Sequence, residues 1–585
     1  MSGSARAVLA RISLFAIVAF SCLDTGFAAS LTAAGADGTL VVDDQVLIKM
    51  HDGGILSATV VRPREAAPLP TLLTLNIYTD PARFRDEGAR LTARGYVSVI
   101  ADTRGKRLSP DPIEPYEHEA ADAYDVIDWI AHQPWSNGKV GMLGGSYSGF
   151  TAWAATKRLH PALKTIAVSA AAIPGLGLPM YNNVFLSANY QWIFYVSDNK
   201  LLDNAANDDG ARWRDLEFNW FASGRPYQEI DRIDGKPNPF LHRWLEHPAY
   251  DDYWQHMVPY GRDFAHIDIP VLTITGYYDD GQISALHYLR EHLKYRPGAE
   301  HYAVMGPYDH LGTHAGTKPA TLRDYPIDSV AQFSTPELKL QWMDYVLKGG
   351  LKPALLSNKI NYEVMGANAW RHVSSLEAMS PHPLTLYFTA QRIGNRYRLA
   401  ARRPEGQGPV SQRVDFANRR ILHGFHTYPS PIVQKNLEDV TELQFVTEPF
   451  EHPTIISGSF EGVLDVTINK KDVDLTVTVY EERPDGTLFH LGYALERASF
   501  AQDATRRVLL HPRQRTRIPF DTTVVARQCE AGSHLLVLLD VNMNPVAEVN
   551  YGTGKDVSLE SVSDATTPLQ VDYQVDSRIV VPIGE

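Results

Sequence analysis

A glycine-flanked serine carries the clearest chemical signal in the sequence. Residues 140–149 (VGMLGGSYSG) begin as an apolar strand, pass through Ser146 and continue into a helix-patterned stretch. A strand-to-helix turn of this kind strains the serine backbone and exposes its side chain, and small neighbours such as Gly144 are needed beside the sheet. A phosphate-binding loop would need a lysine, which this tract lacks. We therefore predict that Ser146 is a nucleophile.

A nucleophilic serine needs two partners, and both follow in the sequence. The hydroxyl is a weak nucleophile at neutral pH, so a base must take its proton and a carboxylate must fix the tautomer of that base. In α/β-hydrolases the acid and then the histidine follow the serine, on loops after later strands. The loop 276–281 (GYYDDG) supplies Asp279, and the loop 306–310 (GPYDH) supplies His310. We predict Asp279 as orienting acid and His310 as general base.

Other assignments of these side chains stay open at this point. A shift of one residue in the loop would make Asp280 the acid in place of Asp279. Ser148 could be the nucleophile, although it lacks a glycine two positions before it.

A metal site is a further alternative. His310 and His314 are four residues apart, as metal ligands on a helix would be, and His301 is near in the sequence. Gly312 disfavours a helix between them, however, and no glutamate accompanies them. We therefore expect no metal and no organic cofactor to take part in the reaction.

Alternating strand and helix patterns must position these side chains. Short apolar runs occur at 71–76, 97–101, 140–143, 165–169, 271–275 and 302–305, with helix-patterned stretches at 120–132, 149–159 and 336–347. A hairpin signal, Asp52-Gly53-Gly54, precedes them within residues 41–61. This alternation is typical of a parallel sheet covered on both faces by helices, so the predicted fold class is α/β.

Two regions depart from the alternation. Between about 173 and 267 aromatic residues are frequent, and we expect a helical insertion whose aromatics mainly form its own core. After residue 351 strand patterns follow one another without helices, which favours a β-sandwich or jelly roll. Asp472 and Asp474 in this part could bind calcium, but their strand-rich context favours a solvated sheet face.

A chain of 585 residues is too long for a single core. The predicted parts are a signal peptide at 1–29, the first part of an α/β-hydrolase domain at 30–180, a helical cap at 181–265, the second part of the hydrolase domain at 266–350 and a C-terminal jelly-roll β-sandwich at 351–585.

Residues 1–29 have the pattern of a secretory signal peptide. Two arginines precede an apolar run at 12–23, and small residues follow it. The run is shorter than the roughly 20 residues that span a bilayer, which disfavours a membrane anchor. Cys22 follows a small residue, so a lipoprotein is an alternative, although Phe20 fits that signal poorly. We expect an exported protein, periplasmic or secreted.

The chain without this segment is acidic. Removal of residues 1–29 leaves 53 basic and 67 acidic residues, a net charge of −14. Such a charge disfavours nucleic acid and anionic membranes as partners. Cys529 is then the remaining cysteine, so no internal disulfide can form, and we expect an inert buried thiol.

Together these motifs resemble the cocaine esterase/X-Pro dipeptidyl-peptidase family of serine hydrolases. The matching tracts are GGSYSG at 144–149, GYYD at 276–279, GPYDH at 306–310, DTRG at 102–105 and NYGTG at 550–554. The resemblance spans the chain after the signal segment and implies the α/β-hydrolase domain, helical cap and jelly roll. It also implies the roles given above to Ser146, Asp279 and His310, and an oxyanion hole made by the Tyr78 hydroxyl and the backbone N–H of Tyr147.

Departures from the family pattern bear on specificity. Lys106-Arg107-Leu108 follow DTRG, where the family has a glycine and a small residue. The branch that hydrolyses α-amino-acid esters has an acidic pair where this chain has Gly281 and Gln282, so we do not predict that specificity.

The resemblance implies an enzyme that cleaves acyl esters or related amides through an acyl-enzyme. X-Pro peptides and β-lactam-type amides are alternative substrates within the family, and its jelly roll makes a homo-oligomer an option. A secreted binding protein with an inactive hydrolase domain is a remote alternative, since such a protein would usually have lost Ser146, Asp279 or His310.

Overall fold

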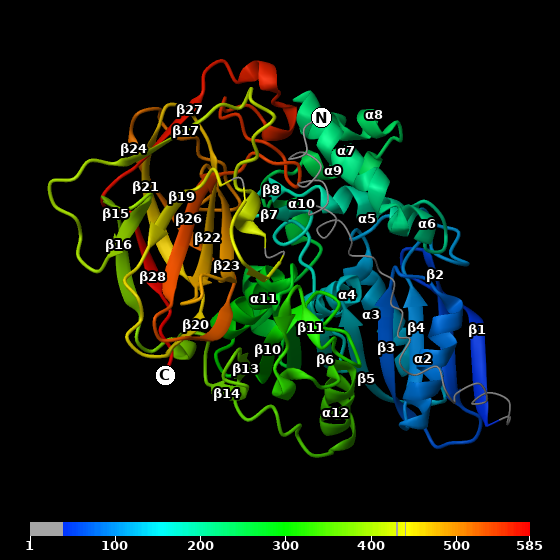
Figure 1. The fold of residues 1–585 in the computed structure, drawn as a ribbon. Coiled ribbons are helices and arrows are strands. Elements are labelled where there is room, and N and C mark those ends of the chain that lie inside the picture. Colours follow the sequence, from blue (N-terminus) through cyan, green and yellow to red (C-terminus); the bar gives the residue numbers. More distant parts are fainter. Residues whose placement is uncertain (1–38, 429–430, 439) are drawn as a thin grey trace.

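The computed structural model describes residues 39–428, 431–438 and 440–585 (Figure 1). The predicted signal peptide lies outside these residues. In the part of the chain that is described, no helix is both long and apolar enough to cross a membrane.

A ten-stranded sheet forms the centre of the first half of the chain. Its strands in spatial order are β1 (Leu40–Lys49), β2 (Ile55–Pro63), β4 (Val97–Asp102), β3 (Leu69–Asn76), β5 (Ser136–Gly145), β6 (Leu163–Ser169), β9 (Val271–Tyr278), β10 (His301–Asp309), β13 (Ile360–Val364) and β14 (Ala369–Val373). The strands from β4 to β13 run parallel, and an antiparallel strand or hairpin extends each edge. The predicted α/β class is confirmed.

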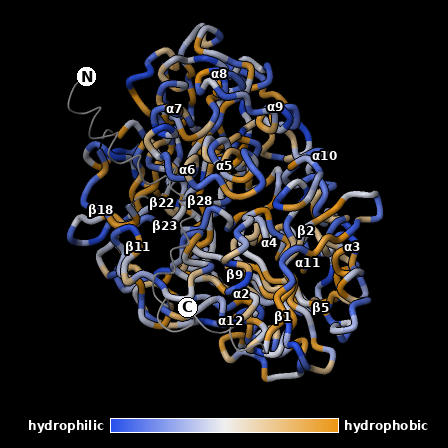
Figure 2. Tube along the Cα trace, turned by 90° about the vertical axis from the view of Figure 1, so that its right-hand side faces the viewer, coloured by the Kyte–Doolittle hydropathy of each residue, from blue (hydrophilic) through white to orange (hydrophobic). Residues whose placement is uncertain are grey.

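Helices cover both faces of this sheet because its strands are apolar on both sides. Leu73 and Leu75 of β3 pack into a core shared with α3 (Glu119–Ala131), α4 (Tyr147–Lys157) and α11 (Gln282–Tyr295). Leu72 points the other way, into a core with α2 (Pro81–Ala93) and α12 (Thr335–Lys348). In Figure 2 orange, hydrophobic segments gather along these strands, and many outer loops are blue.

The insertion between β6 and β9 is a helical cap, as its aromatic composition predicted. It begins with a short hairpin, β7 (Met180–Tyr181) and β8 (Val184–Phe185), and continues with α5 (Ala188–Ser197), α6 (Asn204–Asp208), α7 (Gly210–Ser223), α8 (Ile230–Asp234), α9 (Pro239–Leu245) and α10 (Asp252–Gln255). Most of its large aromatics are buried, among them Trp213, Trp220 and Trp254. They therefore form the core of the cap.

The loop after DTRG joins the cap to the sheet. Lys106 is fully buried, and its Nζ donates hydrogen bonds to the carbonyls of Val196, Asn199 and Leu201 at the end of α5. A cation at a helix C-terminus satisfies carbonyls that have no partner within the helix. Lys106 thus fixes the position of α5 over the sheet.

The C-terminal part is built of strands. A twelve-stranded sheet contains β15 (Leu384–Ile393), β16 (Arg396–Ala400), β17 (Val410–Val414), β18 (Val433–Gln434), β19 (Leu443–Val446), β21 (Glu461–Ile468), β22 (Asp474–Glu482), β23 (Leu488–Arg497), β24 (Arg515–Asp521), β26 (His534–Val541), β27 (Leu569–Tyr573) and β28 (Arg578–Val581). A separate pair is formed by β20 (Thr454–Gly458) and β25 (Val525–Cys529). Cys529 is buried there, which raises the pKa of its thiol and makes it unreactive.

Two strands that follow the domain boundary predicted at residue 351 pair with the hydrolase sheet. β13 and β14 follow that residue but belong to the hydrolase sheet, because β13 pairs in parallel with β10. Alternation alone did not reveal this, since an edge strand and a sandwich strand have the same pattern.

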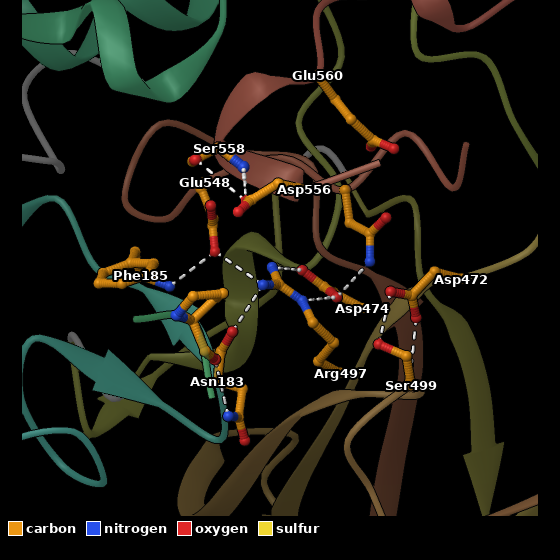
Figure 3. A network of polar contacts seen from close by, with 12 residues as sticks. Asn183, Phe185, Asp472, Asp474, Arg497, Ser499, Glu548, Asp556, Ser558 and Glu560 are labelled. Carbon is orange, nitrogen blue, oxygen red and sulfur yellow. Dashed lines mark hydrogen bonds and ion pairs between the residues drawn. The ribbon is translucent and has the colours of Figure 1, made fainter. Parts of the chain in front are cut away.

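Asp472 and Asp474 lie on no solvated sheet face, so that prediction was wrong. Both are buried, and Figure 3 shows them in a network centred on Arg497. The Arg497 guanidinium donates to both oxygens of Asp474, to Glu548 and to the carbonyl of Asn183. The Arg497 guanidinium thus supplies the positive charge beside Asp474 that a calcium ion was considered for. Through Asn183 the network also links the start of the cap to the jelly roll.

Candidate active site

The turn between β5 and α4 presents Ser146. Its φ of 56° lies in the left-handed region, which a non-glycine residue rarely adopts. The close approach of chain segments explains the glycines around it: a Cβ on Gly144 would come within 2.0 Å of the Ser148 carbonyl oxygen, and one on Gly149 within 2.9 Å of Ala171. Strain at one residue, enforced by tight packing, is typical of functional sites.

Two neighbouring parallel strands bring the acid and the histidine together. Asp279 follows β9 and His310 follows β10, and the carboxyl ends of these paired strands adjoin. The Asp279 Oδ1 lies 3.0 Å from His310 Nδ1. Asp279 is buried and also accepts hydrogen bonds from the Thr275 hydroxyl at 2.7 Å and from the backbone N–H of Gly281 at 2.9 Å. Its orientation is therefore fixed from three sides.

Asp280 also reaches the histidine. Its Oδ1 lies 2.8 Å from His310 Nδ1, and its side chain is 52% exposed, whereas that of Asp279 is fully buried. The ligand atoms of Asp279, Asp280 and His310 lie within 4.8 Å of one another, a donor set that a metal ion could also use. Because both Asp279 oxygens already accept hydrogen bonds, the arrangement suits an oriented imidazole better.

The two carboxylates dominate the electrostatics of His310. Burial alone would lower the pKa of its imidazole, but the charge of Asp280 and the hydrogen bonds to both carboxylates raise it well above the ordinary value. Burial raises the pKa of Asp279. Although desolvation opposes it, the charge of His310 lowers the pKa of Asp280 to about 2. An imidazolium formed at His310 would thus be stabilised by adjacent negative charge.

The predicted oxyanion donors lie next to the serine. The Tyr78 hydroxyl, on the loop after β3, is 3.3 Å from Ser146 Oγ. Tyr147 is the first residue of α4, where backbone N–H groups have no partner within the helix and the helix dipole favours negative charge. The Trp192 indole Nε1 donates to the Tyr78 hydroxyl at 3.3 Å. Two donors can therefore converge on an oxygen bound beside Ser146.

A small pocket opens above these groups. It has a volume of about 70 Å³, well below the ~300 Å³ of pockets for drug-sized ligands. Its lining consists of Tyr78, Tyr116, Ser146, Tyr147, Ala172, Leu178, Ala188, Asn189, Gln191, Trp192, Asn207, Asp280 and His310. The structure thus brings the predicted serine, histidine and both tyrosines to one pocket, with Asp279 behind the histidine.

The rival nucleophile has a structural role. Ser148 is buried in α4, and its hydroxyl donates to the Asn76 side-chain oxygen at 2.9 Å. Of the histidines considered as metal ligands, His301 contacts Thr273 and His292. His314 contacts Ser169 and packs edge-on against His310, with ring centroids 5.3 Å apart.

Sequence reasoning missed the cap residues that line the pocket. Asn189, Gln191 and Trp192 lie on α5, where residues three apart share one face of the helix. The aromatic crowding of this segment was visible, but its pattern did not separate core from pocket. The mixed polar and apolar composition of residues 188–192 was the available signal.

A strained serine at a strand-to-helix turn, with an acid and a histidine after later strands of the same sheet, defines an α/β-hydrolase-type serine hydrolase. Comparisons with known proteins agree. The family model of X-Pro dipeptidyl-peptidase (S15 family) matches residues 52–312, and that of the X-Pro dipeptidyl-peptidase C-terminal non-catalytic domain matches residues 355–580. The chain belongs to this family of serine hydrolases, which includes cocaine esterase.

Three similar proteins resemble it over nearly their whole length. Cocaine esterase from Rhodococcus sp. (strain MB1 Bresler) is 25% identical over 94% of this chain and 99% of its own. An α-amino acid ester hydrolase has the same fold, with a TM-score of 0.76 and 20% identity over 96% of this chain and 99% of that one. The structure of an aminopeptidase from a marine sediment archaeon, Thaumarchaeota archaeon, is similar with a TM-score of 0.73. The two chains are 18% identical, over 94% of this chain and 97% of that one.

Proposed function

We propose that this enzyme hydrolyses small acyl esters through a Ser146–His310–Asp279 triad and an acyl-enzyme intermediate. The observation that carries the proposal is the strained Ser146, which shares a pocket with His310 and lies 3.3 Å from the Tyr78 hydroxyl. The whole-length similarity to cocaine esterase supports an ester as the substrate.

The contacts of His310 indicate how the proton moves. Its Nδ1 faces Asp279 and Asp280, so in this mechanism Nε2 is the nitrogen that accepts the Ser146 proton. Ser146 Oγ attacks the ester carbonyl while His310 takes its proton, and the resulting imidazolium then gives that proton to the leaving alcohol. Water, deprotonated by His310, next attacks the acyl-enzyme carbonyl; the bond to Oγ breaks, the carboxylic acid leaves, and Ser146 Oγ takes the proton back from His310.

The oxyanion of each tetrahedral intermediate would be held by Tyr78 and Tyr147. The hydroxyl of the first and the backbone N–H of the second supply hydrogen bonds that strengthen as negative charge develops on the carbonyl oxygen. The N-terminus of α4 adds its dipole to the same position. The small pocket volume favours substrates with a compact group at this end.

The test is steady-state hydrolysis of p-nitrophenyl acyl esters and X-Pro p-nitroanilides by the enzyme without residues 1–29. Wild type and Ser146→Ala are compared with Ser148→Ala, whose hydroxyl lies outside the pocket lining. Ester turnover that is lost in Ser146→Ala and kept in Ser148→Ala supports the proposal. Ester turnover that survives in Ser146→Ala overturns it.

Cleavage of peptides or amides is the second candidate, and one observation favours it. Asp280 is a half-exposed carboxylate in the pocket lining and could receive the ammonium group of an amino-terminal residue. Anilide turnover without ester turnover in the same experiment would select this candidate.

We further propose that the enzyme is exported. Support comes from the apolar run at 12–23 with its preceding arginines and the small residues that follow it. Fractionation of cells that express the full chain, with N-terminal sequencing of the product, tests it. Full-length chain in the cytoplasmic fraction would be the contrary result.

A further inference from the structure

A cleft of about 510 Å³ lies outside the reaction pocket. Its volume falls within the ~300–1,000 Å³ of small-molecule sites, whereas the pocket at Ser146 has about 70 Å³. The segment that enters the cap, helix α11 of the hydrolase domain and strands of the jelly roll form its walls. Its lining consists of Leu176, Tyr181, Asn182, Gln282, Ile283, Leu286, His287, Arg290, Glu461, Gly462, Glu496, Ala501, Pro519, Phe520, Asp521, Thr522, Thr523 and Val524. The described linings of the two cavities share no residue.

Two opposed walls of the cleft are apolar. Ile283 and Leu286 come from α11, and Pro519 and Phe520 come from β24. Ile283 and Pro519 are half-buried, so part of this apolar surface is still in contact with water. Ligand sites are typically lined by such surface together with a few polar groups that fix orientation. The apolar walls therefore suit the hydrocarbon part of a small molecule.

The polar groups of the cleft are mainly acidic. Among the described residues that line it, the carboxylates are Glu461, Glu496 and Asp521, and the one permanent cation is Arg290. Arg290 is placed 3.4 Å from Asp521 Oδ2. Burial lowers the pKa of His287 to about 4, so its imidazole adds no positive charge at neutral pH. Ionised carboxylates thus outnumber cations in the lining.

The protein does not compensate this excess of acid. Burial raises the pKa of Glu496 well above its ordinary value, and the charge of Asp521 adds to the rise. Burial and the charge of Asp521 also raise the pKa of Glu461, its neighbour across the β21–β24 pair. A positive charge in the cleft would favour the ionised form of all three carboxyls.

Glu461 and Glu496 are the carboxylates that a ligand can reach. Glu461 is exposed and Glu496 is half-buried. The Oε1 of Glu496 accepts a hydrogen bond from Asn182 Nδ2 at 2.8 Å, which orients the carboxylate. An ionised carboxylate has about four acceptor sites, so capacity for a ligand is left. Asp521 contributes charge rather than a contact, because its Oδ1 is buried and its Oδ2 faces Arg290.

An organic cation fits these groups better than a metal ion does. A metal needs several ligand atoms that converge on one point. Among the residues that the structure describes, three such atoms converge at Asp279, Asp280 and His310, which lie outside this cleft. An ammonium group needs only one or two acceptors, and the hydrocarbon group that carries it can cover the apolar walls.

We propose that this cleft is a second ligand site, which binds an organic ammonium ion. The ammonium group pairs with the Glu496 carboxylate, while Glu461 and Asp521 add negative charge. The hydrocarbon group packs between α11 and β24. No residue of the proposed triad takes part, so the site goes beyond the proposed function.

Two probes of the same shape test the charge requirement. 2-(4-Fluorophenyl)ethylammonium and 2-(4-fluorophenyl)ethanol differ only in the terminal group, and fluorine NMR titration measures millimolar affinities of both. We expect a Kd of about 1 mM for the ammonium probe and binding at least about 10-fold weaker for the alcohol. Equal affinities, or no binding of the ammonium probe up to about 10 mM, overturn the inference.

Variants of the lining assign the site. Glu496→Gln keeps an acceptor for Asn182 but removes the charge, and it should weaken binding of the ammonium probe about 10-fold or more. Glu461→Gln, at an exposed position, should weaken it about 3-fold and provides the test if the first variant folds poorly. Glu65→Gln makes the same change in net charge at an exposed position outside the cleft and should leave the Kd unchanged. An unchanged Kd in both cleft variants overturns the inference.

Two further variants separate the cleft from the reaction pocket. Asp280→Asn removes the carboxylate of that pocket, and Ser146→Ala removes the proposed nucleophile; both should bind the ammonium probe as wild type does. Weaker binding in Asp280→Asn with none in Glu496→Gln would place the ammonium in the reaction pocket and overturn the inference. Because Ser146→Ala keeps the cleft, failure of the proposed esterase function would leave this result intact.

Discussion

The indole Nε1 of Trp192 lies 3.3 Å from the hydroxyl oxygen of Tyr78, which in turn lies 3.3 Å from Ser146 Oγ. An indole nitrogen can only donate, so it occupies a lone pair of the tyrosine oxygen. The tyrosine proton must then point away from Trp192. Trp192 would therefore act through Tyr78 as a positioning residue.

Replacement of these two residues should have unequal effects. Tyr78→Phe removes an oxyanion donor and should lower kcat by about 100- to 1000-fold. Trp192→Phe leaves the donor in place but no longer restrains it, so we expect a loss of about 10-fold in kcat. The double variant should be no slower than Tyr78→Phe alone, because the indole acts only through the hydroxyl. Steady-state kinetics on one ester measures all three, and fully additive losses would contradict the coupling.

Asp279 and Asp280 can be separated by isosteric substitution. Asp279 is fully buried and held by Thr275 and Gly281, whereas Asp280 is half exposed. Asp279→Asn should lower kcat by about 1000- to 10000-fold, since the amide would favour the wrong tautomer of His310. Asp280→Asn should cost no more than about 10-fold. The reverse order of the two losses would make Asp280 the orienting acid.

The sequence was sufficient for the parts of the site that local backbone geometry determines. The strand-to-helix turn requires glycine near Ser146, and the loops after two apolar runs could be located from those runs, so Ser146, Asp279 and His310 could be proposed as site residues. The position of Trp192 could not be found, because it depends on how α5 packs over the sheet.

Long-range pairing explains the other differences. Asp474 was expected at a solvated face, but it pairs with Arg497, its cross-strand neighbour on β23, and its side chain is buried. β13 follows residue 351 yet pairs with β10 of the hydrolase sheet, as Ile360 with Ala303, and alternation does not identify a strand's partner. Contacts of this kind are set by tertiary packing rather than by local pattern.

Activity should depend on pH through His310. The imidazole must be neutral to accept the Ser146 proton, so kcat/KM should be high above its pKa and fall as the pH drops through it. Because the neighbouring carboxylates raise this pKa above its ordinary value, the fall should begin above pH 6.5. Asp280→Asn removes one of these charges and should move the acid limb of the profile to lower pH. An unchanged limb in that variant would show that Asp280 does not influence His310.

Stability should also depend on pH, through a buried acid of the cap. Glu217 on α7 is 6% exposed, and its Oε2 has no hydrogen-bond partner among the described residues. Burial raises the pKa of this carboxyl to about 8. The folded chain therefore keeps a proton that the unfolded chain releases near pH 4.5. The contribution of Glu217 to the free energy of unfolding is fully present below that pH and is lost as the pH rises to about 8.

Glu217→Gln should remove the free-energy cost of burying an ionised carboxylate, because glutamine has nearly the same shape and carries no charge. We expect the variant to be more stable than wild type by about 1 to 3 kcal/mol at pH 8, with a difference that shrinks toward pH 5. Asp215→Asn, an exposed substitution on the same helix, should leave stability within about 0.5 kcal/mol of wild type. Thermal melts across this pH range measure the effect. A Glu217→Gln difference that does not change with pH would mean that Glu217 has a charge-stabilising partner in the folded cap.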